Sequence, residues 1–183
     1  MTRQKDLDKL HAEIEACVKC PLHESRFNAV PGEGPADARL MLVGEAPGGR
    51  EDESGRPFVG RSGALLTTLL SGIGLSRSDV FITSILKSRP PKNRTPTRSE
   101  IEACRPYLDR QIEIINPQII VLLGGVAVSS IIGPWKMGDA HGKFYEGGGR
   151  KFFITYHPAA ALRFPRFKDV MKADFEVLRQ ELG

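Results

Sequence analysis

The chain has 183 residues, 40% of them hydrophobic, which is enough to close one substantial core, so we expect a single domain over residues 1–183. Its net charge of +4 favours a polyanionic partner but is too small to identify one. The amino terminus is charged throughout, and no run approaches the roughly 18 apolar residues of a membrane helix. These features argue against a signal peptide or membrane anchor and predict a soluble, cytoplasmic protein.

The first predicted element is an amphipathic helix over about residues 4–16, because Leu7, Leu10 and Ile14 recur at helical spacing. It ends at a Cys-x-x-Cys pair, Cys17 and Cys20. The chain has three cysteines, and an odd number disfavours a disulfide framework. In a reducing compartment such a pair more often binds metal or does redox chemistry.

Four apolar, β-branched runs then predict buried strands at residues 38–44, 80–86, 118–125 and 151–158. Helical patterns separate them at residues 63–74, 99–116 and 125–133. This alternation predicts an α/β fold, a three-layer sandwich with a central, mostly parallel four-stranded sheet flanked by helices.

Ligands of such sheets bind beyond the carboxyl ends of the strands, which selects residues 44–60, 87–97 and 157–166. Taken singly, each stretch has a simpler interpretation as a glycine turn, a solvated acidic face or a basic turn. All three, however, fall at one edge of one sheet. A carboxylate, an aromatic ring, a histidine and a cationic loop are therefore expected to face one crevice.

The motifs CVKCPLHESRFNAVPGEG, GEAPGGREDESGRPFVGRSG, SRPPKNRTPT and HPAAALR run nearly from end to end of the chain. With them the sequence resembles the uracil-DNA glycosylase superfamily, specifically its fourth, iron-sulfur-containing, thermophile-type family. The resemblance implies an enzyme of DNA repair that excises uracil. It also implies a uracil-DNA glycosylase-like version of the α/β fold predicted above.

The chemistry of base excision fits the residues at this edge. A glycosylase flips the nucleotide into a pocket and stacks the base on an aromatic surface, for which Phe58 is our candidate. Cleavage leaves positive charge on the sugar and negative charge on the base. We expect Glu45 to serve the sugar and to position or deprotonate the attacking water, and His157 to donate to the base oxygen.

The resemblance extends these roles to further residues. The expected substrate-binding residues are Gly44, Ala46, Pro47, Gly48, Glu51, Phe58, Ser84 and Asn93. Lys87, Arg89, Lys92 and Arg94 are expected to contact phosphates, which fixes register without reading sequence. Leu162 or Arg163, in the segment 160–166, would enter the minor groove as a wedge.

Two positions depart from the family pattern. Ser84 stands where the family usually has an asparagine that reads the uracil edge, and a hydroxyl cannot make the two-point contact of an amide. Ser88 stands where the family has its third cluster cysteine, which leaves Cys17, Cys20 and Cys104 with one hydroxyl. Serine ligation, a water ligand, a three-iron cluster, a zinc ion and the absence of any metal all remain open.

Two alternative functions remain open: a glycosylase for another deaminated base, hypoxanthine or xanthine, and a non-catalytic paralogue that binds damaged DNA. Ser84 supports the first, whereas Glu45 and His157 argue against the second. Covalent capture of the abasic sugar belongs to a related branch with a basic insertion that is absent here. The expected partner is uracil-containing DNA, bound by a monomer with no membrane partner, and a sliding clamp is a further candidate.

Overall fold

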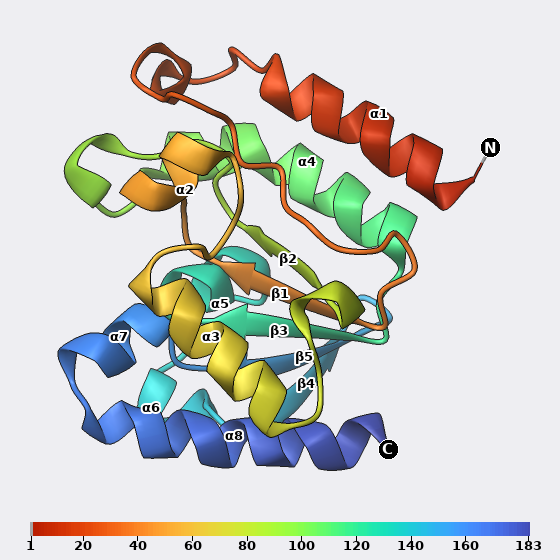
Figure 1. Cartoon of the computed structure of the whole chain (residues 1–183), viewed down its shortest axis with the longest axis vertical. Coiled ribbons are helices and arrows are strands. Elements are labelled where there is room, and N and C mark those ends of the chain that lie inside the picture. Colours follow the sequence, from red (N-terminus) through yellow and green to blue (C-terminus); the bar gives the residue numbers. More distant parts are fainter. Residues whose placement is uncertain (1) are drawn as a thin grey trace.

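The computed structural model describes residues 2–183 (Figure 1). Its α-helices are α1 (Arg3–Glu15), α2 (Gly49–Ser54), α3 (Arg61–Gly72), α4 (Arg98–Ile115), α5 (Gly125–Ile131), α6 (Met137–Ala140), α7 (Pro158–Arg163) and α8 (Arg166–Leu182). Its strands are β1 (Leu40–Gly44), β2 (Phe81–Ser84), β3 (Ile119–Leu123), β4 (Lys143–Gly147) and β5 (Arg150–Thr155). Three short 3-10 helices are η1 (Pro21–Glu24), η2 (Arg77–Asp79) and η3 (Pro91–Asn93).

The strands form one sheet in the order β2-β1-β3-β5-β4. The neighbours from β2 to β5 pair in parallel, as the sequence predicts, whereas β4 pairs antiparallel with β5. The predicted count of four strands is therefore wrong by one. β4 has no apolar run to reveal it, because it lies at the sheet edge with most of its residues partly or fully exposed.

Helices cover both faces of the sheet, which confirms the predicted three layers (Figure 1). Side chains alternate along each strand, so Met41 and Val43 join the core under α4 and α5, while Leu40 and Leu42 join the core under α3 and α8. Both faces of the strands are apolar because both are buried.

The first helix forms an additional layer outside α4. Leu10 and Ile14 of α1 pack with Tyr107 of α4 and with Ala29 in a small core of their own. The predicted helix over residues 4–16 is thus confirmed to within a residue at each end. Among residues 2–183, no helix combines the length and the apolar character needed to cross a membrane.

The parallel register brings three strand ends to one edge of the sheet. Gly44 at the end of β1 lies opposite Ser84 at the end of β2, and β5 ends at Thr155, two residues before His157. The segments that follow these strands therefore meet beyond the same edge, where the sequence predicts the ligand site.

Candidate active site

A pocket of about 310 Å³ opens at this edge of the sheet. Its walls come from the segments after β1, β2 and β5, together with the loop before β1 and the start of α3. The lining residues are Val30, Glu45, Ala46, Pro47, Gly48, Glu51, Pro57, Phe58, Ser62, Ser84, Pro90, Asn93, Arg94, His157 and Ala159.

Most of the residues expected to act on the base come together in this pocket. Both catalytic candidates and all but one of the substrate-binding candidates line it. The exception, Gly44, lies directly beneath the pocket wall, because a Cβ added there would meet the Phe58 ring at 2.5 Å. Glycine at this position therefore lets the aromatic ring pack onto the end of β1.

Glu45 follows β1 and is held by its own backbone, since its carbonyl oxygen accepts a hydrogen bond of 3.1 Å from the Leu86 amide. The carboxyl side chain is partly buried in the pocket wall. Burial raises its pKa above the ordinary value, because the apolar surroundings penalise the charged form. A carboxylate of raised pKa is a better proton acceptor than an exposed one.

His157 is the N-cap of α7, and its Nδ1 accepts a hydrogen bond of 3.1 Å from the Ala159 amide. Since the amide can only donate, Nδ1 carries no proton and the neutral ring is protonated at Nε2. Burial lowers the pKa of His157 to about 4, so the ring is neutral at pH 7. The side chain thus offers an uncharged N–H donor to the pocket.

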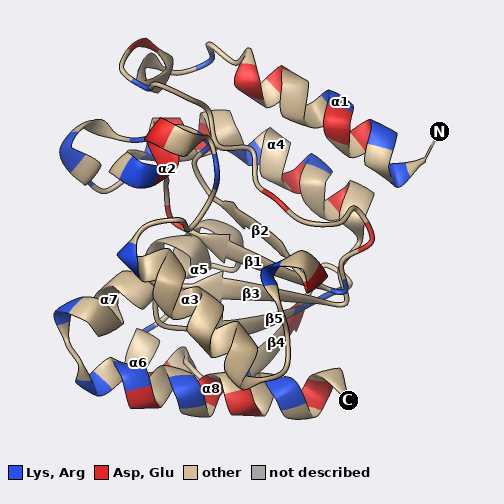
Figure 2. Ribbon diagram, viewed as in Figure 1, with Lys and Arg blue, Asp and Glu red and all other residues tan. Residues whose placement is uncertain are grey.

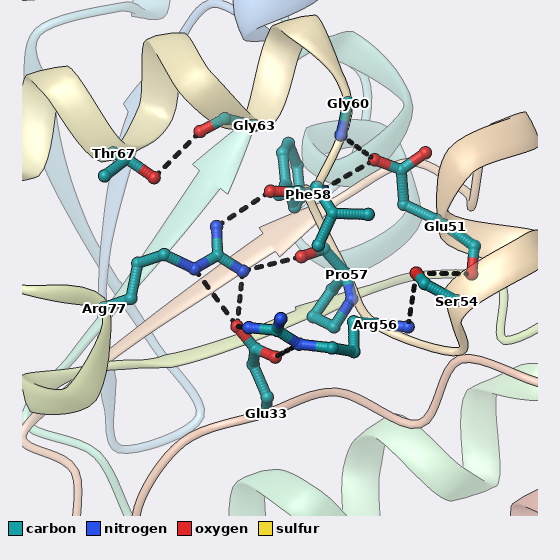
Figure 3. A network of polar contacts seen from close by, with 11 residues as sticks. Glu33, Glu51, Ser54, Arg56, Pro57, Phe58, Gly60, Gly63, Thr67 and Arg77 are labelled. Carbon is teal, nitrogen blue, oxygen red and sulfur yellow. Dashed lines mark hydrogen bonds and ion pairs between the residues drawn. The ribbon is translucent and has the colours of Figure 1, made fainter.

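Phe58 forms an aromatic wall beside this histidine, with ring centroids 5.6 Å apart and planes inclined by 31°. Its backbone is in the left-handed region, with φ of 50°, which is uncommon for a bulky residue. The loop that carries it is held by Glu51, whose carboxylate accepts hydrogen bonds of 2.9 Å from the amides of Val59 and Gly60 (Figure 3). Glu51 therefore both lines the pocket and fixes one side of the loop.

The structure contradicts the predicted phosphate contact of Lys87. Its side chain is only 2% exposed, and its ammonium donates to Thr83 Oγ1, to the Ser84 carbonyl and to Gln111 Oε1 at 2.6, 2.8 and 2.8 Å. A charged group buried with three acceptors cannot reach DNA. Lys87 instead fastens the end of β2 to α4.

The other basic residues of this loop remain near the surface. Lys92 is exposed, and Arg89 is partly buried and donates to Asn93 Oδ1 at 2.8 Å. Arg94 lines the pocket and pairs with Glu100 at 2.6 Å. In Figure 2 the loop before α4, the start of α3 and the corner between α7 and α8 all carry basic residues on the same side of the molecule.

The α7–α8 corner holds an aromatic residue that the sequence reasoning missed. Phe164 is 45% exposed, and the guanidinium groups of Arg163 and Arg166 lie 5.3 and 5.9 Å from its ring centre. Leu162, one of the two expected wedge residues, is partly buried, whereas Arg163 is exposed. A phenylalanine placed between Arg163 and Arg166, directly after the HPAAALR motif, is the sequence signal that could have revealed it.

The cysteine region supplies three of the four thiolates that a family-type iron-sulfur cluster needs. Cys17 and Cys20 are partly buried, Cys104 is buried, and burial raises the pKa of the Cys104 thiol. At the fourth position, Ser88 Oγ accepts a hydrogen bond of 2.8 Å from Arg26, a cation where a ligand set would have an anion. The residues present thus do not fit a four-thiolate cluster.

A single metal ion would likewise need several ligand side chains close together. Within residues 2–183, no group of three or more histidine, cysteine, aspartate or glutamate side chains is arranged to hold one.

Comparison with known proteins identifies the family of the chain. The model of the uracil DNA glycosylase superfamily matches residues 31–181. The chain is 51% identical to a type-4 uracil-DNA glycosylase of Pyrobaculum aerophilum, over 92% of this chain and 91% of the relative. It is 48% identical to that of Saccharolobus solfataricus (97% and 87% covered) and 46% identical to that of Thermotoga maritima (88% and 86% covered). The chain therefore belongs to the uracil DNA glycosylase superfamily.

Proposed function

We propose that the protein is a DNA repair glycosylase that hydrolyses the N-glycosidic bond of uracil in DNA and leaves an abasic site. The observation that carries this proposal is the pocket in which Glu45, Phe58 and His157 face the same cavity. Relatives named type-4 uracil-DNA glycosylase support uracil as the base.

The pocket supports a base-flipping reaction. A base inside a duplex is out of reach, so the nucleotide must rotate out and its base must stack against a wall, here Phe58. The buried Ser84 hydroxyl and the Asn93 amide face the same cavity and would contact the polar edge of the base. Ala46, Pro47 and Gly48 form the remaining wall after β1.

His157 acts on the departing base. Its Nε2–H donates to the uracil oxygen on which negative charge develops as the glycosidic bond breaks. Because the ring is neutral, it stabilises the anionic base through a hydrogen bond from Nε2–H and not through the positive charge of an imidazolium.

Glu45 acts on the sugar side. Its carboxylate stabilises the positive charge that develops on the sugar and accepts a proton from the water that attacks the anomeric carbon. The base departs with the electron pair of the broken bond, and the water oxygen supplies the new bond. These groups suffice for hydrolysis without a covalent intermediate.

The basic surface beside the pocket binds the DNA backbone. Arg89, Lys92 and Arg94 contact phosphates and set the register of the duplex. Among the residues of the α7–α8 corner, Phe164 is better placed as a wedge than Leu162, because it is exposed and apolar and has arginines on both sides. Arg163 would then contact a phosphate next to the gap.

For the iron-sulfur cluster that the family resemblance implies, the role would be structural, since none of the three cysteines lines the pocket. Ser88 leaves such a cluster one thiolate short. We therefore expect the protein to hold less iron than a chain with four cysteines at these positions.

The direct test is release of uracil from a labelled oligonucleotide, read as strand cleavage after alkali. Cleavage at uracil supports the proposal, and a protein that binds this DNA without cleaving it would be a damage-binding paralogue. Cleavage only at hypoxanthine or xanthine would favour the second enzymatic candidate, for which Ser84 is the supporting observation.

The proposal includes a monomer that works in the cytoplasm. Size-exclusion chromatography of the protein, alone and mixed with a sliding clamp, tests its oligomeric state and that partner. A stable dimer would contradict the first expectation.

A further inference from the structure

Phe58, the aromatic wall of the pocket, has a backbone conformation that phenylalanine rarely adopts. Phe58 has a left-handed φ of 50°, and its carbonyl crowds Gly63, where an added Cβ would meet the Phe58 oxygen at 1.8 Å. Such a conformation persists only when the surroundings fix it from several sides. The question is which side chains do so.

Arg77 holds the carbonyl side of this loop (Figure 3). It lies in η2, just before β2, and its guanidinium donates to the Phe58 oxygen at 2.8 Å and to the Pro57 oxygen at 2.7 Å. One planar group thus grips two successive carbonyls. The side chain is only 20% exposed, so these hydrogen bonds are largely shielded from water.

Glu33 in turn fixes the guanidinium. Its carboxylate accepts from Arg77 Nη2 at 2.5 Å and from Nε at 3.1 Å. The Glu33 backbone exchanges two hydrogen bonds with Ile82 of β2, at 2.8 and 2.9 Å, which anchors the carboxylate to the sheet. Arg56 also pairs with this carboxylate, at 2.8 Å, but its guanidinium donates to neither loop carbonyl.

The two sides of the loop are therefore held by different charged groups. Arg77 takes the carbonyls of residues 57 and 58, and Glu51 takes the amides of residues 59 and 60. Figure 3 shows the Phe58 ring between them. Because the backbone is held on both sides, the direction of the Phe58 Cα–Cβ bond is fixed, and the contact of the ring with Gly44 limits its rotation about the side-chain bonds.

We propose that Arg77, oriented by Glu33, is a positioning residue that sets the angle of the Phe58 ring against the flipped base. This inference rests on the proposed function, because it gives the ring a base to stack on. Arg77 does not line the pocket, and in this proposal it acts on the base through the Phe58 ring, by way of the two loop carbonyls that it holds. Its loss should let the loop rotate and should tilt the ring away from the stacking plane, and small misplacements of this kind are costly in rate.

The experiment compares Arg77→Met with the matched control Arg56→Met, since both remove one guanidinium from Glu33 but only the first frees the loop carbonyls. We expect Arg77→Met to slow single-turnover excision of uracil by about tenfold to a hundredfold and to weaken inhibition by free uracil. Arg56→Met should match the parent within about twofold on the same principle. Amide hydrogen exchange of residues 58–60 should quicken in Arg77→Met only.

A double variant separates positioning from general stability. In a Phe58→Ala background, Arg77→Met should cause no further loss of rate, because the ring through which it acts is gone. Equal losses in both backgrounds would overturn the inference. If Arg77→Met fails to fold, Arg77→Lys serves instead, since one ammonium can keep Glu33 but cannot grip both carbonyls, and an intermediate rate is expected.

The outcomes distinguish a failure of the Arg77 proposal from a failure of the proposed function. A parent protein that releases no uracil would overturn the proposed function, and the amide hydrogen exchange of residues 58–60 would still report whether Arg77 holds the loop. A parent that excises uracil no faster than Arg77→Met would leave the function intact and overturn the positioning role.

Discussion

The base pocket and the cysteine region carry the same kind of departure, a serine in place of a functional side chain, but they differ in what surrounds it. Ser84 lies in a pocket whose walls are held by Glu51, Arg77 and the strand ends. Ser88 lies at the fourth position of the cysteine ligand set that the family resemblance implies, and its hydroxyl accepts a hydrogen bond from Arg26. A site framed by protein hydrogen bonds can lose one contact and keep its shape, whereas a four-thiolate ligand set that loses one member can no longer complete its coordination with sulfur alone.

The largest effect is expected from a variant that removes the negative charge of Glu45 and keeps the shape of the pocket. Glu45→Gln should reduce the single-turnover rate of uracil excision by about a hundredfold or more, because both the sugar's counter-charge and the water's proton acceptor are lost. DNA affinity, measured by fluorescence anisotropy, should stay unchanged. Excision at the parental rate would show that Glu45 is not catalytic.

The pH profile sharpens this test. Burial raises the pKa of Glu45 above 4.5, so the active carboxylate is lost as pH falls through that raised value, and the rate should drop by about tenfold for each further pH unit. His157, with a pKa of about 4, should protonate only in stronger acid and stays neutral above that value. Glu45→Gln should lack the first acid limb, and a profile that still shows it would assign the limb to another group.

The third prediction concerns Ser84, which stands where the resemblance implies an asparagine. Ser84→Asn should raise the rate of uracil excision by roughly tenfold, since an amide supplies a hydrogen bond to the base edge that the shorter hydroxyl lacks. Ser62→Asn is the control, because Ser62 lines the same pocket from α3. Rates on uracil, hypoxanthine and xanthine should be compared. Equal uracil rates for the parent and Ser84→Asn would mean that this position does not read the base.

The smallest effect on rate is expected in the cysteine region. Ser88→Cys should increase iron per chain and visible absorbance, because it completes a four-thiolate set, while uracil excision stays as in the parent. Ser71→Cys, on the opposite face of the sheet, controls for an added thiol. A parent that already holds as much iron as Ser88→Cys would show that the serine does not limit the cofactor.

Most of the fold could be predicted from the sequence because buried parallel strands are continuous apolar runs. β4 could not, since an edge strand with exposed side chains lacks that signal. The helix α8 has a regular apolar spacing through Met171, Phe175 and Leu178, so its signal was present and the sequence reasoning did not use it.

Part of the site could be predicted from strand order alone, since the carboxyl ends of parallel strands meet at one edge and bring Glu45 and His157 together. The hydrogen-bond partners of individual charged side chains could not be predicted in this way. Lys87 is in a basic stretch, yet its acceptors come from β2 and α4, which are far apart in sequence. Arg77 likewise has no local pattern, because its partners are the carbonyls of a loop 19 residues away.

The helix α7 connects the proposed catalytic histidine with the proposed DNA contact. His157 stands at one end of a six-residue helix, and Arg163 and Phe164 stand at the other. The hydrogen bond that keeps the proton on Nε2 is made to this helix. If DNA bound at the far end displaced this helix, the displacement would reach the imidazole through less than two turns of helix. A poorly seated duplex would therefore misalign the proton donor, so that the enzyme would test the fit of its substrate before it cleaves.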